Sequence, residues 1–411
     1  MTPTPRAAAI LAVIAVAALA IPAWVVVAAT LALLAAVAAD AWTVRRAPSL
    51  RREVPTVLSR GVETTMSARA SPTDGRRVLL RQPAAPGVTV LRDTGGGELS
   101  PVLVGERRGR VSLPGIASAS IGPLGLARVH HRALTPVELA VYPDLLSARR
   151  LILRLRRTLA GLAGGLARGP IGLGPEFESV RDYSPDDDIR QLNWLATARL
   201  GRPMSNQYRV ERDRDVLCLV DCGRLTSAPL GERTVLDTSL DALTVIALAA
   251  DELGDRFGAV AFDDGIRRSV APRHRGGRPA IDALFDLTSV PLDSDFERAF
   301  AHLSRLRRAL VFVHTDLIDE TAARSLVAGM VVLARRHSVI VTGAADPELR
   351  GLADNGQEPA RALAALDVLA TRRQAALALR QAGARVLEAP PAQLAERCLT
   401  IYVSAKLRGS W

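Results

Sequence analysis

The sequence predicts an α/β protein. We expect a doubly wound, mostly parallel sheet, preceded by a small β-sandwich-like domain and an N-terminal transmembrane helical hairpin. Three observations predict this order: an uncharged stretch near the N-terminus, short β-prone runs after it, and apolar strands that alternate with helical patterns in the C-terminal half. The chain therefore divides into a hairpin at 1–45, a β domain at 53–145, a basic helix and a long polar signature segment at 146–214 and the α/β domain at 215–411.

The composition excludes several classes of protein. The 411 residues include 53 basic and 42 acidic side chains, for a net charge of +11. Three cysteines, none spaced as CxxC, exclude a disulfide scaffold and a zinc ribbon. Lys406 is the one lysine, so there is no Gly-Lys-Ser/Thr triplet for a P-loop. An aromatic content of 4% argues against base-stacking surfaces, and we expect no nucleic acid partner.

The N-terminal stretch predicts a membrane element in contact with the lipid bilayer. Residues 7–39 carry no charge, and Pro22 interrupts them near the middle. We expect two short helices, about 7–21 and 23–39, joined by a tight turn. Positive residues flank the stretch on both sides: Arg6 before it, and Arg45, Arg46, Arg51 and Arg52 after it. Because positive residues favour the cytoplasmic side, both ends are expected there. One long span and a cleaved signal peptide are the alternatives.

The two middle parts have different characters. Short β-prone runs at 78–80, 88–91, 101–104, 110–113 and 137–142 are separated by turn residues, which is typical of a small sandwich. A helix rich in arginine follows at 145–167. It is predicted either to lie on anionic lipid or, as we favour, to pack on a neighbouring element with its charges in water.

The C-terminal part predicts the parallel sheet. The expected strands are 216–220, 258–262, 309–314, 339–342 and 384–387. The expected helices are 234–253, 278–287, 295–307, 320–337, 361–382 and 392–407. Continuous apolar strands are typical of parallel sheets that are buried on both faces. Residues 266–270 follow an Asp-Asp-Gly turn and are expected to form an antiparallel edge strand.

Two carboxylates follow strands of this sheet. Asp221 ends the first strand, and Asp316 comes directly after the strand 309–314. If these strands are neighbours, the carboxylates converge at the carboxyl edge of the sheet, where such folds bind ligands. No GxSxG motif and no dinucleotide-binding loop are present. Cys222 follows the same strand end, but no base can be assigned to it. We therefore expect no enzyme activity.

A long polar segment precedes the first strand. It runs Gly-Pro-Glu-Phe-Glu-Ser-Val-Arg-Asp-Tyr-Ser-Pro-Asp-Asp-Asp at 174–188 and Ile-Arg-Gln-Leu-Asn-Trp-Leu-Ala-Thr-Ala-Arg at 189–199. Gln-Tyr at 207–208 and Glu-Arg-Asp at 211–213 follow. This segment resembles the signature of the bacterial family called domain of unknown function 58. The order of elements is also similar to that family, so the resemblance covers nearly the whole chain.

The resemblance implies a fold, a cellular location and a partner. It implies a von Willebrand factor A-like fold for 215–411 and a place in the bacterial cell membrane, where the flanking positive residues put the soluble domains in the cytoplasm. Members of the family are commonly encoded beside MoxR-type AAA+ ATPases, which implies such an ATPase as partner.

The resemblance also allows a comparison of metal ligands. Metal-binding A domains carry Asp-x-Ser-x-Ser after the first strand, whereas this chain has Asp-Cys-Gly-Arg-Leu at 221–225. Gly223 and Leu225 offer no side-chain oxygen, and the matching groups are Asp221, Asp316 and Ser294. We expect no cofactor, or at most a weak Mg²⁺ site at these three residues. The alternative is that an arginine or backbone amides satisfy Asp221.

The signature segment is the predicted partner surface. The residues concerned are Glu176, Phe177, Arg181, Tyr183, Asp186, Asp187, Asp188, Arg190 and Trp194. Aromatic residues such as Trp194 and Tyr183 often anchor interfaces, although they equally suit packing of the segment on the sheet. The leading hypothesis is a non-enzymatic, membrane-anchored adaptor or scaffold for the ATPase or its client. A metal-dependent hydrolase and an envelope-associated structural protein are the alternatives.

Overall fold

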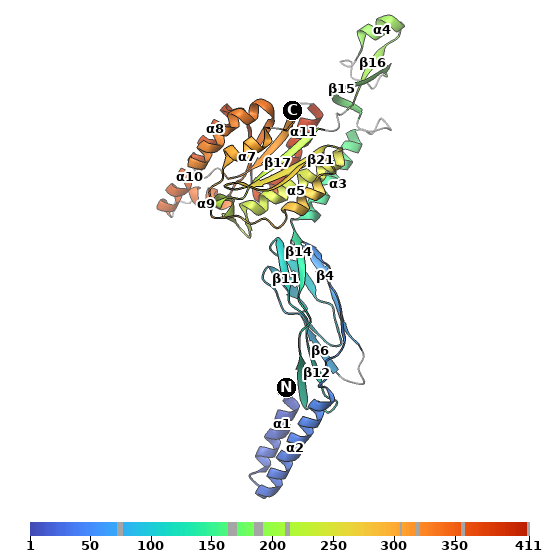
Figure 1. The fold of residues 1–411 in the computed structure, drawn as a ribbon, viewed down its shortest axis with the longest axis vertical. Coiled ribbons are helices and arrows are strands. Elements are labelled where there is room, and N and C mark those ends of the chain that lie inside the picture. The colour runs from blue at the N-terminus through green and yellow to red at the C-terminus, as the bar shows by residue number, and fades with distance from the viewer. Residues whose placement is uncertain are drawn as a thin grey trace. The chain divides into compact units, whose positions relative to one another are not determined.

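The computed structural model describes residues 1–71, 77–162, 171–184, 192–209, 214–304, 306–316, 320–354 and 358–408. These residues form two compact units, Met1–Tyr142 and Pro143–Trp411 (Figure 1). The helices of the predicted hairpin therefore belong to the same unit as the β domain.

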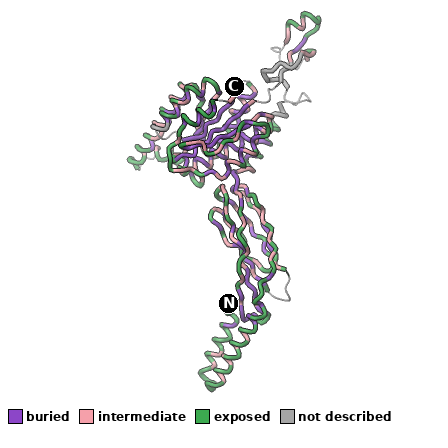
Figure 2. Tube along the Cα trace, in the orientation of Figure 1, coloured by how far each residue is buried: buried purple, intermediate pink, exposed green. Residues whose placement is uncertain are grey.

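Two apolar helices open the first unit. They are α1 (Pro5–Ala17) and α2 (Ala23–Thr43), which contact each other and expose most of their side chains (Figure 2). The break at Pro22 agrees with the sequence, but α1 ends at Ala17 instead of residue 21, and residues 18–20 form a turn before the proline. Among the described helices, only α2 is long and apolar enough to cross a membrane.

The rest of the first unit consists of short strands. After β1 (Thr2–Pro3), the strands are β2 (Leu50–Glu53), β3 (Val57–Ser59), β4 (Glu63–Thr65), β5 (Ser67–Ala70), β6 (Arg77–Arg81), β7 (Val88–Leu91), β8 (Thr94–Gly95), β9 (Glu98–Leu99), β10 (Val102–Gly105), β11 (Gly109–Leu113), β12 (Ala117–Ile121), β13 (Ala127–His131) and β14 (Val137–Tyr142). They form four small sheets around one core that includes Leu58, Leu80, Leu103 and Leu139. Alternating burial along β10 shows that one side of this strand faces that core.

One buried carboxylate ties the helices to the β domain. Asp40, near the end of α2, accepts hydrogen bonds from the backbone N–H groups of Leu124 (2.9 Å), Leu126 (2.8 Å) and Ala127 (2.9 Å). Just before α1, the backbone N–H of Thr4 donates to the carbonyl of Leu126 (3.0 Å). Both ends of the apolar segment are therefore fixed to the same turn between β12 and β13.

The second unit contains a six-stranded sheet in the order β21-β20-β17-β22-β23-β24. The bounds are β17 (Asp215–Asp221), β20 (Arg256–Phe262), β21 (Ile266–His274), β22 (Ala309–His314), β23 (Ser338–Ala344) and β24 (Arg385–Ala389). All neighbours are parallel except β21, which pairs antiparallel with β20 at the edge. The prediction of a mostly parallel sheet with an antiparallel edge strand is thus confirmed.

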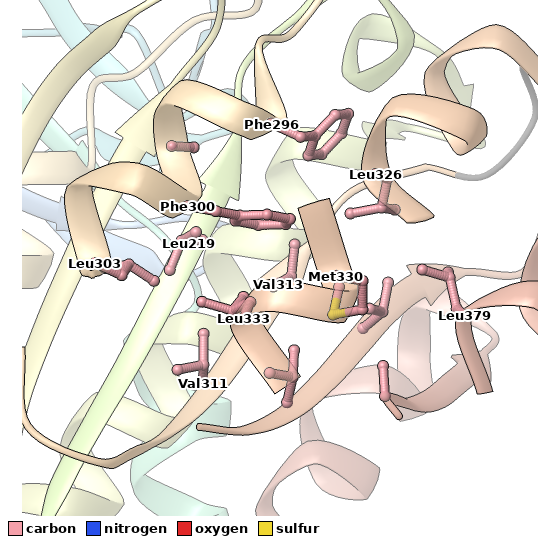
Figure 3. Packing of buried hydrophobic residues seen from close by; sticks show 14 of the residues in the cluster. Leu219, Phe296, Phe300, Leu303, Val311, Val313, Leu326, Met330, Leu333 and Leu379 are labelled. Carbon is pink, nitrogen blue, oxygen red and sulfur yellow. The ribbon is translucent and has the colours of Figure 1, made fainter. Parts of the chain in front are cut away.

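Helices cover both faces of this sheet. They are α5 (Val235–Leu253), α6 (Gly277–Leu284), α7 (Phe296–Leu303), α8 (Glu320–Arg336), α9 (Pro347–Asp354), α10 (Pro359–Gln381) and α11 (Pro391–Arg408). Phe296, Phe300 and Met330 pack on Leu219 and Val313 in the core formed with α7, α8 and α10 (Figure 3). The alternate residues of β17 and β22 are buried as well, and α5 and α11, which pack on each other, cover that face. Helix α9 was not expected from the sequence.

The part of the second unit that precedes β17 forms a helix and a β-ribbon. Helix α3 (Leu145–Leu162) packs on α5, which agrees with the favoured prediction for the basic helix. The signature segment pairs β15 (Ile171–Asp182) with β16 (Met204–Arg209), and α4 (Trp194–Leu200) lies between them. Asn193 caps α4 through a hydrogen bond to the backbone N–H of Ala196 (2.9 Å), and Gly201 ends it with a φ of 65°.

Candidate functional site

The strand order places the candidate site at the centre of the sheet. From β17 the chain passes first to β20 on one side, and β22 later joins β17 on the other side. In parallel sheets of this kind, a crevice opens at the carboxyl ends of the two strands where the order reverses. Asp221 is the last residue of β17, and Thr315 and Asp316 follow β22 at this point. The sequence therefore located both carboxylates at the correct edge.

Asp221 is held by three donors. Its carboxylate accepts hydrogen bonds from the Ser294 hydroxyl, from the Thr315 hydroxyl (2.6 Å) and from the backbone N–H of Gly223 (2.8 Å). Asp221 itself is buried. The predicted approach of Ser294 to Asp221 is found, whereas the sequence analysis missed Thr315. Its position directly after a strand was the one signal that could have indicated it.

Asp316 is held differently, by a buried cation. One terminal nitrogen of Arg372 donates to both carboxylate oxygens of Asp316, at 2.9 and 3.2 Å. Arg372 comes from α10, and both side chains are buried. One alternative from the sequence was that an arginine pairs with Asp221. In the structure, an arginine pairs with Asp316 instead. Nothing in the local sequence indicated Arg372, because its role depends on how α10 packs.

These residues do not fit a divalent cation. A Cβ atom at position 223 would overlap the Ser294 hydroxyl and lie 2.8 Å from the carbonyl oxygen of Leu292, so the serine of a metal-binding A domain has no room there. Asp316 is engaged by Arg372, and hydroxyl and amide protons point at Asp221. No group of three or more metal-ligating side chains occurs among the residues that the structure describes. Magnesium requires a near-octahedral set of oxygens, which this arrangement does not offer.

Two further polar residues near the strand ends lack the features of catalytic groups. His314 ends β22, and its Nδ1 contacts the Thr342 hydroxyl at 2.6 Å. Burial lowers the pKa of His314 to about 3, so the ring is neutral at physiological pH. Cys222 is fully buried and its thiol points at the carbonyl of Val220 (3.7 Å), so it is not an accessible nucleophile.

The electrostatics of Asp221 give a pH dependence with a defined sign. Burial raises the pKa of its carboxyl, against the hydrogen bonds from Ser294, Thr315 and Gly223, which lower it, and Asp263 adds a smaller upward effect. The folded protein therefore binds this proton more tightly than the unfolded chain. Protonated Asp221 therefore stabilises the folded protein at a pH below the unfolded pKa. This stabilisation is lost as the pH rises through the folded pKa.

We expect Asp221→Asn to be more stable than the wild type at neutral pH, because an asparagine stays neutral and keeps an oxygen for Ser294 and Gly223. The advantage should shrink as the pH falls towards about 4, where the unfolded carboxyl takes up its proton. Urea denaturation of the full chain in detergent micelles at several pH values measures this. Asp264→Asn, at an exposed carboxylate, is the control and should show no such trend. An Asn variant less stable than the wild type at neutral pH would show that the site prefers the charged form.

The described part of the signature segment is the second feature of interest. In α4, Trp194 is 72% exposed, Leu195 68% and Leu200 57%. Trp194 is therefore not packed on the sheet, which was one of the two interpretations of the sequence. Arg181 donates to the carbonyl of Asp182 (3.0 Å), and the N–H of Tyr183 bonds the carbonyl of Pro203 (3.0 Å).

Other predicted partner residues lie in or beyond the ribbon. Glu176 and Phe177 lie in β15 and pair with β16. Asp186, Asp187, Asp188 and Arg190 lie outside the described residues.

Comparisons with known proteins agree with the signature. A family model described as "Protein of unknown function DUF58" matches residues 179–382. Uncharacterized proteins of Mycobacterium tuberculosis and Mycobacterium bovis are each 27% identical over 227 residues, which are 52% of this chain and 69% of the relative. A crystal structure of an uncharacterized membrane spanning protein from Vibrio fischeri is 13% identical and covers 47% of this chain and 99% of its own, with a TM-score of 0.15, which is too low to carry an argument. The match over the signature and most of the sheet shows that the chain belongs to the DUF58 family.

Proposed function

We propose that this protein is a non-enzymatic, membrane-anchored adaptor that engages a MoxR-type AAA+ ATPase or its client. The observation that carries the proposal is the exposed apolar surface of α4, formed by Trp194, Leu195 and Leu200. A tryptophan and two leucines that are exposed to solvent on a capped helix are typical of a surface that a protein partner covers. The family resemblance supplies the identity of the partner.

The candidate site at the sheet supports a binding role over a catalytic one. Asp221 and Asp316 are buried, and each is satisfied by groups of the same chain. The strand order, with β17 and β22 at the centre, supports a von Willebrand factor A-like arrangement. A buried, internally paired polar cluster stabilises the edge of the sheet on which loops are displayed.

The first unit supports a two-pass anchor. Thr4 and Asp40 are bound to the same turn, so the chain enters and leaves the apolar pair at the same end. This arrangement requires that both ends lie on one side of the bilayer. Arg6 and Arg45, which flank the pair, favour the cytoplasmic side. The helix α1 has 13 residues and spans about 20 Å, so the bilayer would thin locally around it.

Removal of the apolar surface should weaken the complex with the ATPase. We expect the double variant Trp194→Ser/Leu195→Ser to bind a MoxR-type ATPase of the same organism at least about tenfold more weakly, because buried tryptophans often dominate interfaces. The measurement is co-purification of the ATPase with the full chain in detergent micelles, followed by titration. The matched control is Val332→Ser, at a valine of α8 that is 67% exposed. A wild-type chain that never retains the ATPase, or equal loss in the control, would refute the proposal.

A further inference from the structure

A groove on the second unit lies away from both sites. It has a volume of about 520 Å³ and is formed by three elements: one face of α3, the end of α5, and the turn between β21 and α6. The residues that line it are Arg149, Ile152, Leu153, Arg156, Leu248, Asp251, Glu252, Arg275 and Arg278. Four are arginines and two are acidic, so the groove carries an excess of positive charge.

Both acidic groups of the groove are already engaged. Glu252 accepts two hydrogen bonds from Arg156. Asp251 accepts hydrogen bonds from the backbone N–H groups of Gly277 (2.9 Å) and Arg278 (3.3 Å) at the start of α6. Both carboxylates thus have partners, and the lining still has two more positive than negative side chains.

Two arginines of the groove keep their charge uncompensated. Arg278 pairs with Asp282 at 3.0 Å. Arg149 and Arg275 form no ion pair with any residue in the described ranges. Arg275 also adopts a φ of 51°, a left-handed conformation that disfavours side chains other than those of glycine and asparagine. This conformation belongs to a tight turn, in which the backbone N–H of Gly276 donates to the carbonyl of Arg273 (3.0 Å).

The groove also has an apolar floor, by which we mean its three apolar lining residues. They are Ile152 and Leu153 of α3 and Leu248 of α5. Leu153 is 53% exposed, which leaves apolar surface in contact with water. A ligand that fits this groove therefore combines an anionic group with an adjacent apolar group.

We propose that this groove binds a peptide segment in which a carboxylate stands next to an apolar side chain. The carboxylate lies between Arg149 and Arg275, because a guanidinium group can form bidentate hydrogen bonds with a carboxylate. The neighbouring side chain covers Leu153 and Leu248. The charge complementarity and the open apolar floor carry this assignment, which is independent of the α4 surface and of any ATPase.

The test uses the full chain in phosphatidylcholine nanodiscs and a fluorescein-labelled octapeptide of alternating glutamate and leucine. We expect saturable binding by fluorescence anisotropy, and a loss of about tenfold or more in affinity for Arg149→Gln/Arg275→Gln. Leu153→Gln should also weaken binding, and a peptide of alternating glutamate and glycine should bind less well. Arg157→Gln, at an exposed arginine of α3 outside the groove, is the matched control and should bind as the wild type does.

Three results would overturn the proposal. The first is the absence of saturable binding to the wild type, and the second is a double variant that binds like the wild type. The third is unchanged peptide binding together with lost affinity of the double variant for phosphatidylglycerol vesicles, which would assign the groove to a lipid headgroup. Binding of the ATPase by the same variants should stay intact, so failure here is distinguishable from failure of the adaptor proposal.

Discussion

Replacement of Arg372 by methionine should lower the free energy of unfolding of the second unit by about 3–5 kcal/mol, because it leaves the Asp316 carboxylate buried without its cation. The effect should be largest around α10, since the pair is the polar link between this helix and the carboxyl edge of the sheet. Urea denaturation of the full chain in detergent micelles gives the overall loss. Hydrogen exchange of the amides in Pro359–Gln381 shows whether the loss begins at this helix.

Two further variants separate the ion pair from the volume of the side chain. Arg373→Met changes the next, exposed arginine of α10 and should alter stability by no more than about 0.5 kcal/mol. Adding Asp316→Asn to Arg372→Met removes the orphaned charge and should recover a large part of the loss. If the double variant were as unstable as the single one, packing of Arg372 and not its charge would hold α10.

Replacement of Lys406 by methionine should destabilise the same unit by a similar amount, about 3–5 kcal/mol. Asp255, between α5 and β20, is fully buried and accepts hydrogen bonds from the Lys406 ammonium (2.6 Å) and the Tyr402 hydroxyl (2.5 Å). These contacts fix α11 to the sheet, so the variant should lose exchange protection in Pro391–Arg408. Thermal unfolding of the full chain in detergent measures the loss.

The same contact accounts for the one lysine of an arginine-rich chain. A buried ammonium is compact, whereas the planar guanidinium of arginine is larger and has five donors to satisfy. We therefore expect Lys406→Arg to destabilise the protein as well, while Arg408→Met, at an exposed position of the same helix, should have little effect. Full stability of the arginine variant would contradict this explanation.

The sequence was most informative where long apolar runs determine the local structure. Parallel strands buried on both faces must be continuously apolar, so the strands of the sheet and most of its helices could be placed within a few residues. The antiparallel edge strand followed from its turn residues, although β21 extends four residues beyond the expected end. The short helix α9 was missed because it has only eight residues and none of them is buried.

The candidate site was predicted only in part. Asp221 and Asp316 could be located because each follows a strand, and the carboxyl ends of parallel strands share one edge. Arg372 lies 56 residues from Asp316, and no spacing rule relates a mid-helix arginine to a strand end. The same holds for Asp40, whose amide donors lie 84 or more residues away.

By itself, the sequence determined the alternating order of strands and helices, the apolar N-terminal pair and the family, since each depends on residues close together in the chain. Only the tertiary structure decided that the carboxylates are satisfied from within and that Arg149 and Arg275 share a groove. The physical reason is that partners of buried charges are selected by packing between distant elements, because any partner that excludes water and completes the hydrogen bonds will serve.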